Sequence, residues 1–157
     1  MHPAEELRYL VLAAQREGNR MLARELRPLG LTPSQAEVLR VLDDHQPLTL
    51  RGLGELLVCE TTTNPSRLVE RLVATGTITR QPGRRDRREI DLTLTPRGKR
   101  LARQVKTVEQ RLYRTLDTAT AGQDLDAVLT VLRSFVADQP AGKALQRRIE
   151  CSREATT

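Results

Sequence analysis

Apolar residues recur every three or four positions along most of this 157-residue chain, a spacing typical of amphipathic helices. The first segment with this period covers about residues 5 to 27, and Pro28 and Gly30 end it. The pattern therefore predicts one long amino-terminal helix with an apolar stripe. The positions of that stripe are Leu7, Leu10, Val11, Ala14, Gly18, Met21, Leu22 and Leu26.

A second helix is predicted directly after this break, because residues that start helices stand there in the right order. Thr32 is suited to cap the helix, Pro33 fits its first turn, and Gln35 can complete a capping box. The apolar face continues until Asp43, which places His45 in the loop that follows.

Residues 48 to 60 predict a third, short helix that Thr49 can cap. A tight connection, CETTTNPS, leads from it to a fourth helix from about Pro65 to Thr75, with Asn64 as the cap and Gly76 as the stop. In the third helix the residues expected to face inward are Leu50, Leu53, Leu56 and Leu57. In the fourth, Leu68, Leu72 and Val73 are expected inside, and Ser66, Arg67, Glu70 and Arg71 outside.

The period changes after Gly76, where apolar and polar residues begin to alternate. A short strand begins at Ile78, the letters PGRRDR predict a turn, and EIDLTLT predicts a second strand. In that strand Ile90, Leu92 and Leu94 share one face, so the segment is predicted to be a β-hairpin with one buried side.

The rest of the chain returns to helical spacing. Thr95 and Pro96 open a long helix whose apolar seam runs from Leu101 to Leu116 at nearly heptad spacing, which indicates a partner. Another helix is predicted at about residues 124 to 137, and the polar tail from Gln139 is expected to fray after a final helical stretch. The predicted fold class is mainly α with a small β-hairpin.

Composition narrows the class of protein. One Phe, two Tyr and no Trp imply a core of aliphatic side chains, and no apolar run approaches the roughly 20 residues that span a bilayer. The amino terminus lacks the plan of a signal peptide, and the distant Cys59 and Cys151 form no metal motif, so a cytoplasmic protein is expected. Neither a catalytic constellation nor a cofactor motif is found, so an enzyme is not expected.

Positive charge is concentrated around the hairpin. Residues 80 to 100 hold eight basic and three acidic residues, so this region carries +5 of the chain's net charge of +6. Such a focus is typical of a nucleic-acid binder, although an anionic membrane surface or an acidic protein would also suit it.

Two short helices, a tight turn between them and a basic hairpin predict a winged helix-turn-helix. In that arrangement the second short helix enters the major groove and presents its first residues, here Ser66 and Arg67, to base edges. The alternative is that these residues only cap and solvate a helix, and that RQPGRRDRREIDL is a solvated loop.

From about residue 29 to 101 the chain resembles the MarR family of bacterial winged-helix regulators. The stretches that carry the resemblance are LGLTPSQAEVLRVL, LTLRGLGELL and SRLVERLVATGTITRQPGRRDRREIDLTLTPRGKRL. Within them, the DRR of the hairpin and the T-P-R-G that follows it are the most specific. The flanking helices match the family in position and pattern rather than in residues.

The resemblance implies a homodimeric transcriptional regulator, usually a repressor, that binds a palindromic double-stranded DNA operator and leaves it when a small aromatic anion binds. It divides the chain into a dimerisation helix (residues 1–30), a winged helix-turn-helix (31–95) and carboxy-terminal dimerisation helices with a polar tail (96–157). A winged-helix module that binds an acidic protein is the alternative.

The resemblance also implies roles for individual residues. Asp86 would hold a wing arginine in place, and Arg88 would be the wing arginine most directly tied to Asp86 and to DNA. The complete set of candidate DNA contacts is Thr62, Thr63, Asn64, Ser66, Arg67, Arg71, Arg84, Arg85, Asp86, Arg87 and Arg88.

Two further sites are weighed against simpler explanations. Cys59 is a candidate redox sensor or a small hydrophobic residue in a turn, and Glu60 beside it favours the second explanation. Tyr9, Arg16 and Arg20 are candidates to line a ligand crevice, or they serve packing and the dimer interface.

Overall fold

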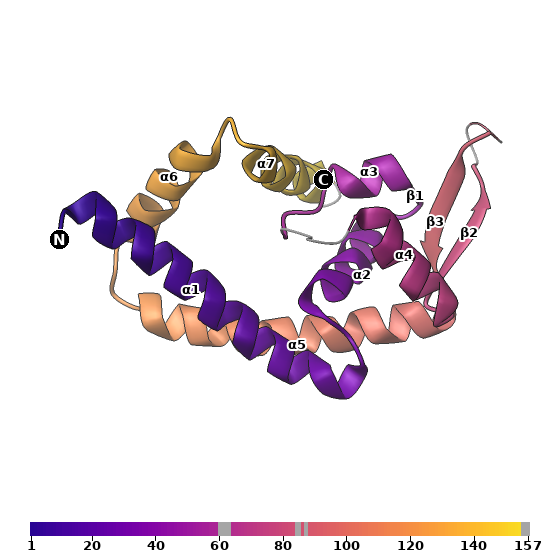
Figure 1. The fold of residues 1–157 in the computed structure, drawn as a ribbon, viewed down its shortest axis with the longest axis horizontal. Coiled ribbons are helices and arrows are strands. Elements are labelled where there is room, and N and C mark those ends of the chain that lie inside the picture. Colours follow the sequence, from indigo (N-terminus) through magenta and orange to yellow (C-terminus); the bar gives the residue numbers. More distant parts are fainter. Residues whose placement is uncertain (60–63, 84–85, 87, 155–157) are drawn as a thin grey trace.

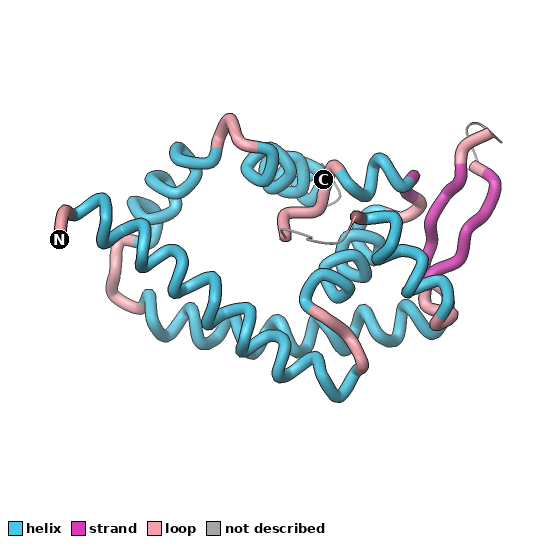
Figure 2. Tube along the Cα trace, in the orientation of Figure 1, coloured by secondary structure: helices cyan, strands magenta, loops and turns pink. Residues whose placement is uncertain are grey.

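The structure is a computed structural model that describes residues 1–59, 64–83, 86 and 88–154. Figure 2 shows that helices dominate the described part and that its strands form a single small sheet. In chain order the elements are α1 (Pro3–Leu26), the 3-10 helix η1 (Arg27–Leu29), α2 (Pro33–His45), β1 (Leu48–Thr49), α3 (Leu50–Gly54), α4 (Pro65–Ala74), β2 (Ile78–Pro82), β3 (Ile90–Leu94), α5 (Pro96–Thr120), α6 (Leu125–Val136) and α7 (Pro140–Glu154).

The predicted helix starts are confirmed. Thr32 and Gln35 form a capping box at the start of α2: the Thr32 hydroxyl accepts from the Gln35 amide at 3.3 Å, and the Gln35 side chain accepts from the Thr32 amide at 2.9 Å. Thr49, Asn64 and Thr95 likewise accept a backbone N–H at the starts of α3, α4 and α5.

The sheet contains one strand more than the predicted hairpin. β2 and β3 pair antiparallel with Ile78 opposite Leu94, and the two-residue β1 adds to the other edge of β3 with Leu48 opposite Leu92. Both Leu92 and Leu94 are buried, as the alternation predicted, whereas Ile90 is 55% exposed. Ile90 pairs with Pro82 at the far end of the hairpin, beyond the reach of the core.

One hydrophobic core unites the winged region with parts of α1 and α5. Its centre is α2, whose Val38, Leu39, Val41 and Leu42 have no exposed surface. Other buried members come from each neighbouring element and include Leu26, Leu53, Leu68, Val69, Leu72, Ile78, Ala102 and Val105. All are aliphatic, as the shortage of aromatic residues predicted.

Two predictions about local structure are wrong. His45 is the last residue of α2 rather than part of a loop, because the helix continues for two residues beyond Asp43. Leu50 was expected inside but is 38% exposed, since α3 is only one turn long and directs Leu53 into the core instead.

The long seam differs in part from prediction, whereas the final helical stretch predicted in the tail is confirmed. Val105 and Val108 of this seam are buried in the chain's own core, whereas Leu116 at its end is 53% exposed. That helical stretch is α7 (Pro140–Glu154), on which Ala144 is buried, and residues 155–157 lie outside the described residues. Figure 1 shows α1 crossing α5, and α6 and α7 leading the chain back to α3.

Candidate nucleic-acid interface

Helix α4 presents one polar face to solvent. Leu68, Val69 and Leu72 are buried against the core that α2 forms, and consequently Arg67 and Arg71 are exposed on the opposite side. The Asn64 side chain accepts from the amide of Ser66 at 3.0 Å and fixes the start of the helix. The amino-terminal turn of α4 is therefore capped, and its end of the helix is suited to an anionic partner.

The connection that precedes α4 is anchored by a residue that sequence reasoning missed. Glu37 lies on α2, is only 8% exposed, and accepts hydrogen bonds from the amides of Val58 and Cys59 at 2.8 and 2.9 Å. The Arg148 guanidinium donates to the same carboxylate at 3.1 Å. A glutamate among the apolar positions of α2 was the only sequence signal for this contact.

The wing is closed by backbone contacts around Asp86. The Asp86 carboxylate accepts from the amide of Arg88 at 2.9 Å, and its carbonyl oxygen accepts from the amide of Glu89 at 3.0 Å. Gly83 donates to the carbonyl oxygen of Glu89 at 2.8 Å, and a Cβ at Gly83 would collide with the Asp86 carbonyl. Asp86 thus shapes the path of the chain at the tip, and its side chain contacts the backbone of Arg88.

The T-P-R-G stretch fastens the base of the wing. The Thr95 hydroxyl accepts from the Gly98 amide at 3.1 Å and lies 2.7 Å from the carbonyl oxygen of Gly76, to which it donates. On the other side of the sheet, the Gln46 side chain accepts from the amide of Leu94 at 2.7 Å. These contacts hold the ends of α2, α4 and β3 and the start of α5 in one unit.

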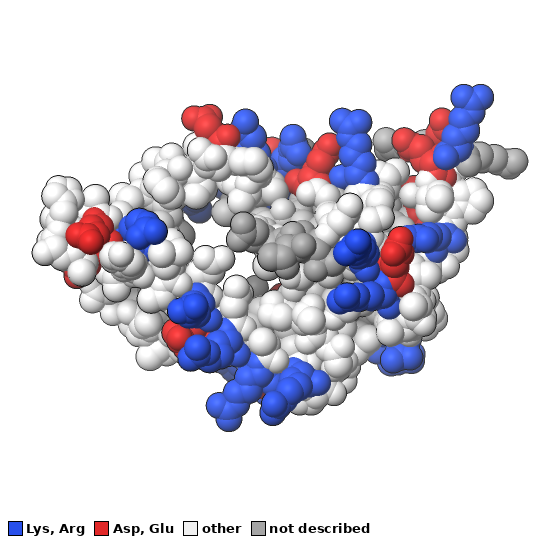
Figure 3. Space-filling view, in the orientation of Figure 1, with Lys and Arg blue, Asp and Glu red and all other residues white. Residues whose placement is uncertain are grey.

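The structure brings together only some of the predicted site residues. Asn64, Ser66, Arg67 and Arg71 lie on α4 or at its cap, and Asp86 and Arg88 lie in the wing. Figure 3 shows basic and acidic side chains side by side in the region of the hairpin, and more basic side chains along the carboxy-terminal half of α1. Predicted contacts outside the described residues are Thr62, Thr63, Arg84, Arg85 and Arg87.

Cys59 occupies an environment that suppresses thiol chemistry. It is half-buried, and burial together with the neighbouring Glu37 carboxylate raises its pKa to about 12, despite the opposing charge of Arg148. Because the thiolate is the reactive form, the surroundings favour the packing role over the redox role.

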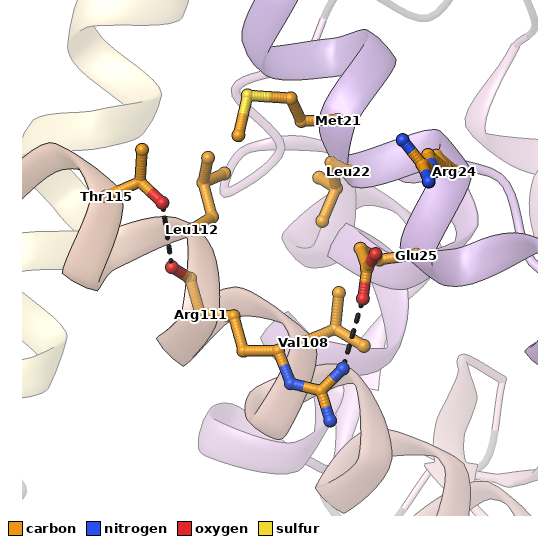
Figure 4. A pocket seen from close by; sticks show the side chains of 8 residues that line it. All are labelled: Met21, Leu22, Arg24, Glu25, Val108, Arg111, Leu112 and Thr115. Atoms are coloured by element: carbon orange, nitrogen blue, oxygen red, sulfur yellow. Dashed lines mark hydrogen bonds and ion pairs between the residues drawn. The ribbon is translucent and has the colours of Figure 1, made fainter.

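A crevice between α1 and α5 has an apolar wall and charged edges. Its volume is about 260 Å³, and its lining includes Met21, Leu22 and Leu112. Figure 4 shows Arg111 paired with Glu25 at one edge, at 3.1 Å, with Arg24 nearby. Tyr9, Arg16 and Arg20 do not line this crevice: they are exposed on the earlier turns of α1, where Arg20 pairs with Glu17 at 3.2 Å.

Two other kinds of site receive no support from the described residues. In residues 1–59, 64–83, 86 and 88–154, His, Cys, Asp and Glu form no group of three that could hold a metal ion. Within the same residues, none of the helices combines the length and apolarity that a membrane span requires.

The fold and this interface define a winged helix-turn-helix protein. Residues 29–89 match the model of the MarR family. No match was found among curated proteins.

Solved structures extend the likeness to the flanking helices. A MarR variant from E. coli in complex with operator DNA has a TM-score of 0.73 at 24% identity, over 83% of this chain and 94% of that one. A probable transcriptional regulator from Pseudomonas aeruginosa has a TM-score of 0.72 at 21% identity, over 85% and 99% of the two chains. Bordetella bronchiseptica BpsR, whose DNA binding 6-hydroxynicotinic acid regulates, has a TM-score of 0.71 at 22% identity, over 88% and 97%.

Proposed function

We propose that this protein represses transcription by binding a palindromic DNA operator as a homodimer. The observation that carries the proposal is the outward face of α4, where Arg67 and Arg71 are exposed on a capped helix beside the wing. Arginine is the side chain that most often reads guanine in the major groove. The complex of the similar E. coli MarR variant with operator DNA supports the same use of the fold.

Within this proposal the two parts of the interface have different roles. Ser66 and Arg67 at the start of α4, with Thr62, Thr63 and Asn64 before it, read bases and nearby phosphates. The wing arginines Arg84, Arg85, Arg87 and Arg88 contact phosphates or a narrow minor groove. Asp86 supports the wing through its hydrogen bond to the amide of Arg88.

Exposed apolar side chains outside the winged region support the homodimer. None of the residues of α6 is buried, although many of them are apolar. Val128, Val131 and Phe135 are 51%, 54% and 81% exposed. Soluble proteins rarely leave such a surface uncovered. Similar exposed residues on α1 and α5 are Leu7, Tyr9, Leu10, Val11, Leu12, Met21, Tyr113 and Leu116. The proposed division is therefore residues 1–30 and 96–157 for dimerisation and residues 31–95 for DNA.

Release by a small aromatic anion completes the proposal. The crevice between α1 and α5 offers an apolar wall for a ring and two arginines, Arg24 and Arg111, for a carboxylate. Tyr9, Arg16 and Arg20 remain candidates if the dimer brings α1 of a second copy to the crevice. The regulation of BpsR by 6-hydroxynicotinic acid supports this class of ligand. A cytoplasmic location follows from action on chromosomal DNA.

Selection from a pool of random duplexes tests the function. The purified protein is expected to enrich a palindrome whose half-sites lie about one helical turn apart. The variant with Arg67→Ala and Arg71→Ala, carried through the same selection, is expected to enrich none. Binding that is equal for the selected duplex and for random DNA would refute a sequence-specific regulator and favour a protein-binding module.

A further inference from the structure

The last helix, α7, is tied to the helix-turn-helix at a single buried carboxylate. The Glu37 oxygen Oε1 accepts from the amide of Val58 at 2.8 Å and from the Arg148 guanidinium at 3.1 Å. The other oxygen, Oε2, accepts from the amide of Cys59 at 2.9 Å. One side chain of α2 thus joins α7 to the connection between α3 and α4.

This connection depends on the carboxylate for its geometry. The amides of Val58 and Cys59 follow the end of α3 and both use Glu37 as their acceptor. Buried N–H groups are rarely left without an acceptor, so the carboxylate determines the path of the backbone there. The described chain resumes at Asn64, which caps α4, and α4 packs against α2, the helix that carries Glu37.

Arg148 supplies the charge that this carboxylate needs. Glu37 is 9% exposed at its side chain and Arg148 is 26% exposed, so the pair is shielded from water. The neighbouring Arg147 makes a very different contact, because it lies 3.6 Å from Glu55 and both side chains are about half exposed, at 51% and 45%. Exposed pairs of this kind contribute little.

The other end of α7 is fixed to α6. Gly142 lies so close to the carbonyl group of Val136 that a Cβ at this position would collide with it. Ala144 is buried two residues further along. A shift of α6 would therefore be passed through α7 to Arg148, and from there to Glu37.

We infer that Arg148 is a positioning residue for DNA recognition: through Glu37 it holds Val58, Cys59 and the face of α2 on which α4 packs, and it makes operator selectivity depend on the placement of α7. The inference rests on the proposed function, because α4 must read DNA for its placement to affect selectivity.

Hydrogen exchange in the DNA-free protein tests the structural half of this inference. Arg148→Ala is expected to accelerate exchange of the Val58 and Cys59 amides by about 10- to 150-fold, the effect of losing one charged hydrogen bond. Arg148→Lys, which keeps the charge, is expected to restore part of the protection. The matched control, Arg147→Ala, should exchange like the wild type. Equal exchange in Arg148→Ala and Arg147→Ala would overturn the inference.

Operator binding tests the functional half. Arg148→Ala is expected to lower the ratio of operator to random-duplex affinity by about tenfold, without changing the salt dependence of random-duplex binding. Glu37→Gln should lower this ratio as well, because an amide nitrogen cannot accept a hydrogen bond from an N–H. The variant with both substitutions should lower the ratio no further than either single substitution, because both break the same contact. Equal weakening on both duplexes would make Arg148 a phosphate contact and overturn the inference. A wild-type protein without operator preference refutes the proposed function instead, while the exchange result still decides the role of Arg148 in holding the connection.

Discussion

The backbone amide of Thr95 donates to the carbonyl oxygen of Thr77 at 3.1 Å and fastens the start of α5 to the segment between α4 and β2. Thr77 is buried, and its carbonyl oxygen also lies against the Cα of Gly98. The wing, α4 and α5 therefore meet at the carbonyl group of Thr77. The T-P-R-G stretch owes its composition to this contact, since Thr caps α5, Pro opens it and Gly allows the close approach.

Gly98→Ala is expected to destabilise the protein by about 1 to 3 kcal/mol, because a Cβ would collide with the Thr77 carbonyl and force the backbone apart. Urea unfolding measures this loss. Gly54→Ala is the matched control, since it is also helical and its Cβ would meet no atom within 4 Å. Similar unfolding midpoints for the two variants would contradict the close contact at Thr77.

Arg67→Ala and Arg88→Ala are expected to affect DNA binding differently. Loss of a base-reading arginine on α4 should reduce discrimination between the operator and single-base variants, by about 1 to 3 kcal/mol at the base concerned. Loss of Arg88 should weaken binding to all duplexes and lower the salt slope by about one. Titrations of both variants at several salt concentrations measure this, and an equal loss of discrimination would show that the roles are assigned wrongly.

Helix starts were predictable because they depend on residues close together in the chain. Thr32 with Gln35, and Thr95 with Pro96, carry their own capping chemistry. The outward face of α4 was predictable for the same reason, since helical periodicity alone separates Arg67 from Leu68.

Features that depend on distant partners could not be predicted in the same way. β1 contains two residues, too few to show a period, and exists because Leu48 pairs with Leu92. The contact of Glu37 could not be predicted, since its partner Arg148 lies 111 positions away. A final helical stretch was expected in the tail, but the ion pairs that join α7 to Glu55 and Glu37 could not be predicted, because both partners lie far away in the chain.

Glu109 on α5 is expected to make stability depend on pH. Burial raises its pKa above the ordinary value of 4.5, although Arg40 lies 3.0 Å away and opposes this shift. The folded state therefore keeps a proton that the unfolded chain has already lost, so stability falls as the pH rises from about 4.5 through the higher folded pKa. Urea unfolding of the wild type and of Glu109→Gln across this pH range measures the effect. The free energy of unfolding of the wild type should fall relative to that of Glu109→Gln as the pH rises. A difference that is constant with pH would rule out this role of Glu109.

Cys59 is expected to resist alkylation in the folded protein. A pKa of about 12, against 9.0 for a free thiol, leaves very little thiolate at pH 8. A thiolate with a high pKa is the stronger nucleophile, which partly offsets its low population. Alkylation of Cys59 should therefore be about 10- to 100-fold slower in the folded protein than in the unfolded chain. The Cys151→Ser variant isolates Cys59, and iodoacetamide labelling in buffer and in urea compares the two states. Equal labelling rates in buffer and in urea would support the redox role of Cys59 instead. Loss of operator binding by this variant after treatment with peroxide would do the same.

Phe135→Asp is expected to weaken the proposed dimer by roughly 100-fold or more. In a symmetric interface the same side chain is lost from both copies, and each buried Phe contributes about 1.5 to 3 kcal/mol. Thr130→Asp is the matched control, because Thr130 lies on the polar side of α6 and its hydroxyl already donates to the carbonyl oxygen of Asp126 at 2.8 Å. Sedimentation equilibrium at micromolar concentration should find dimers for the wild type and Thr130→Asp, and monomers for Phe135→Asp. A monomeric wild type would leave the apolar face of α6 without its proposed partner and would falsify the homodimer.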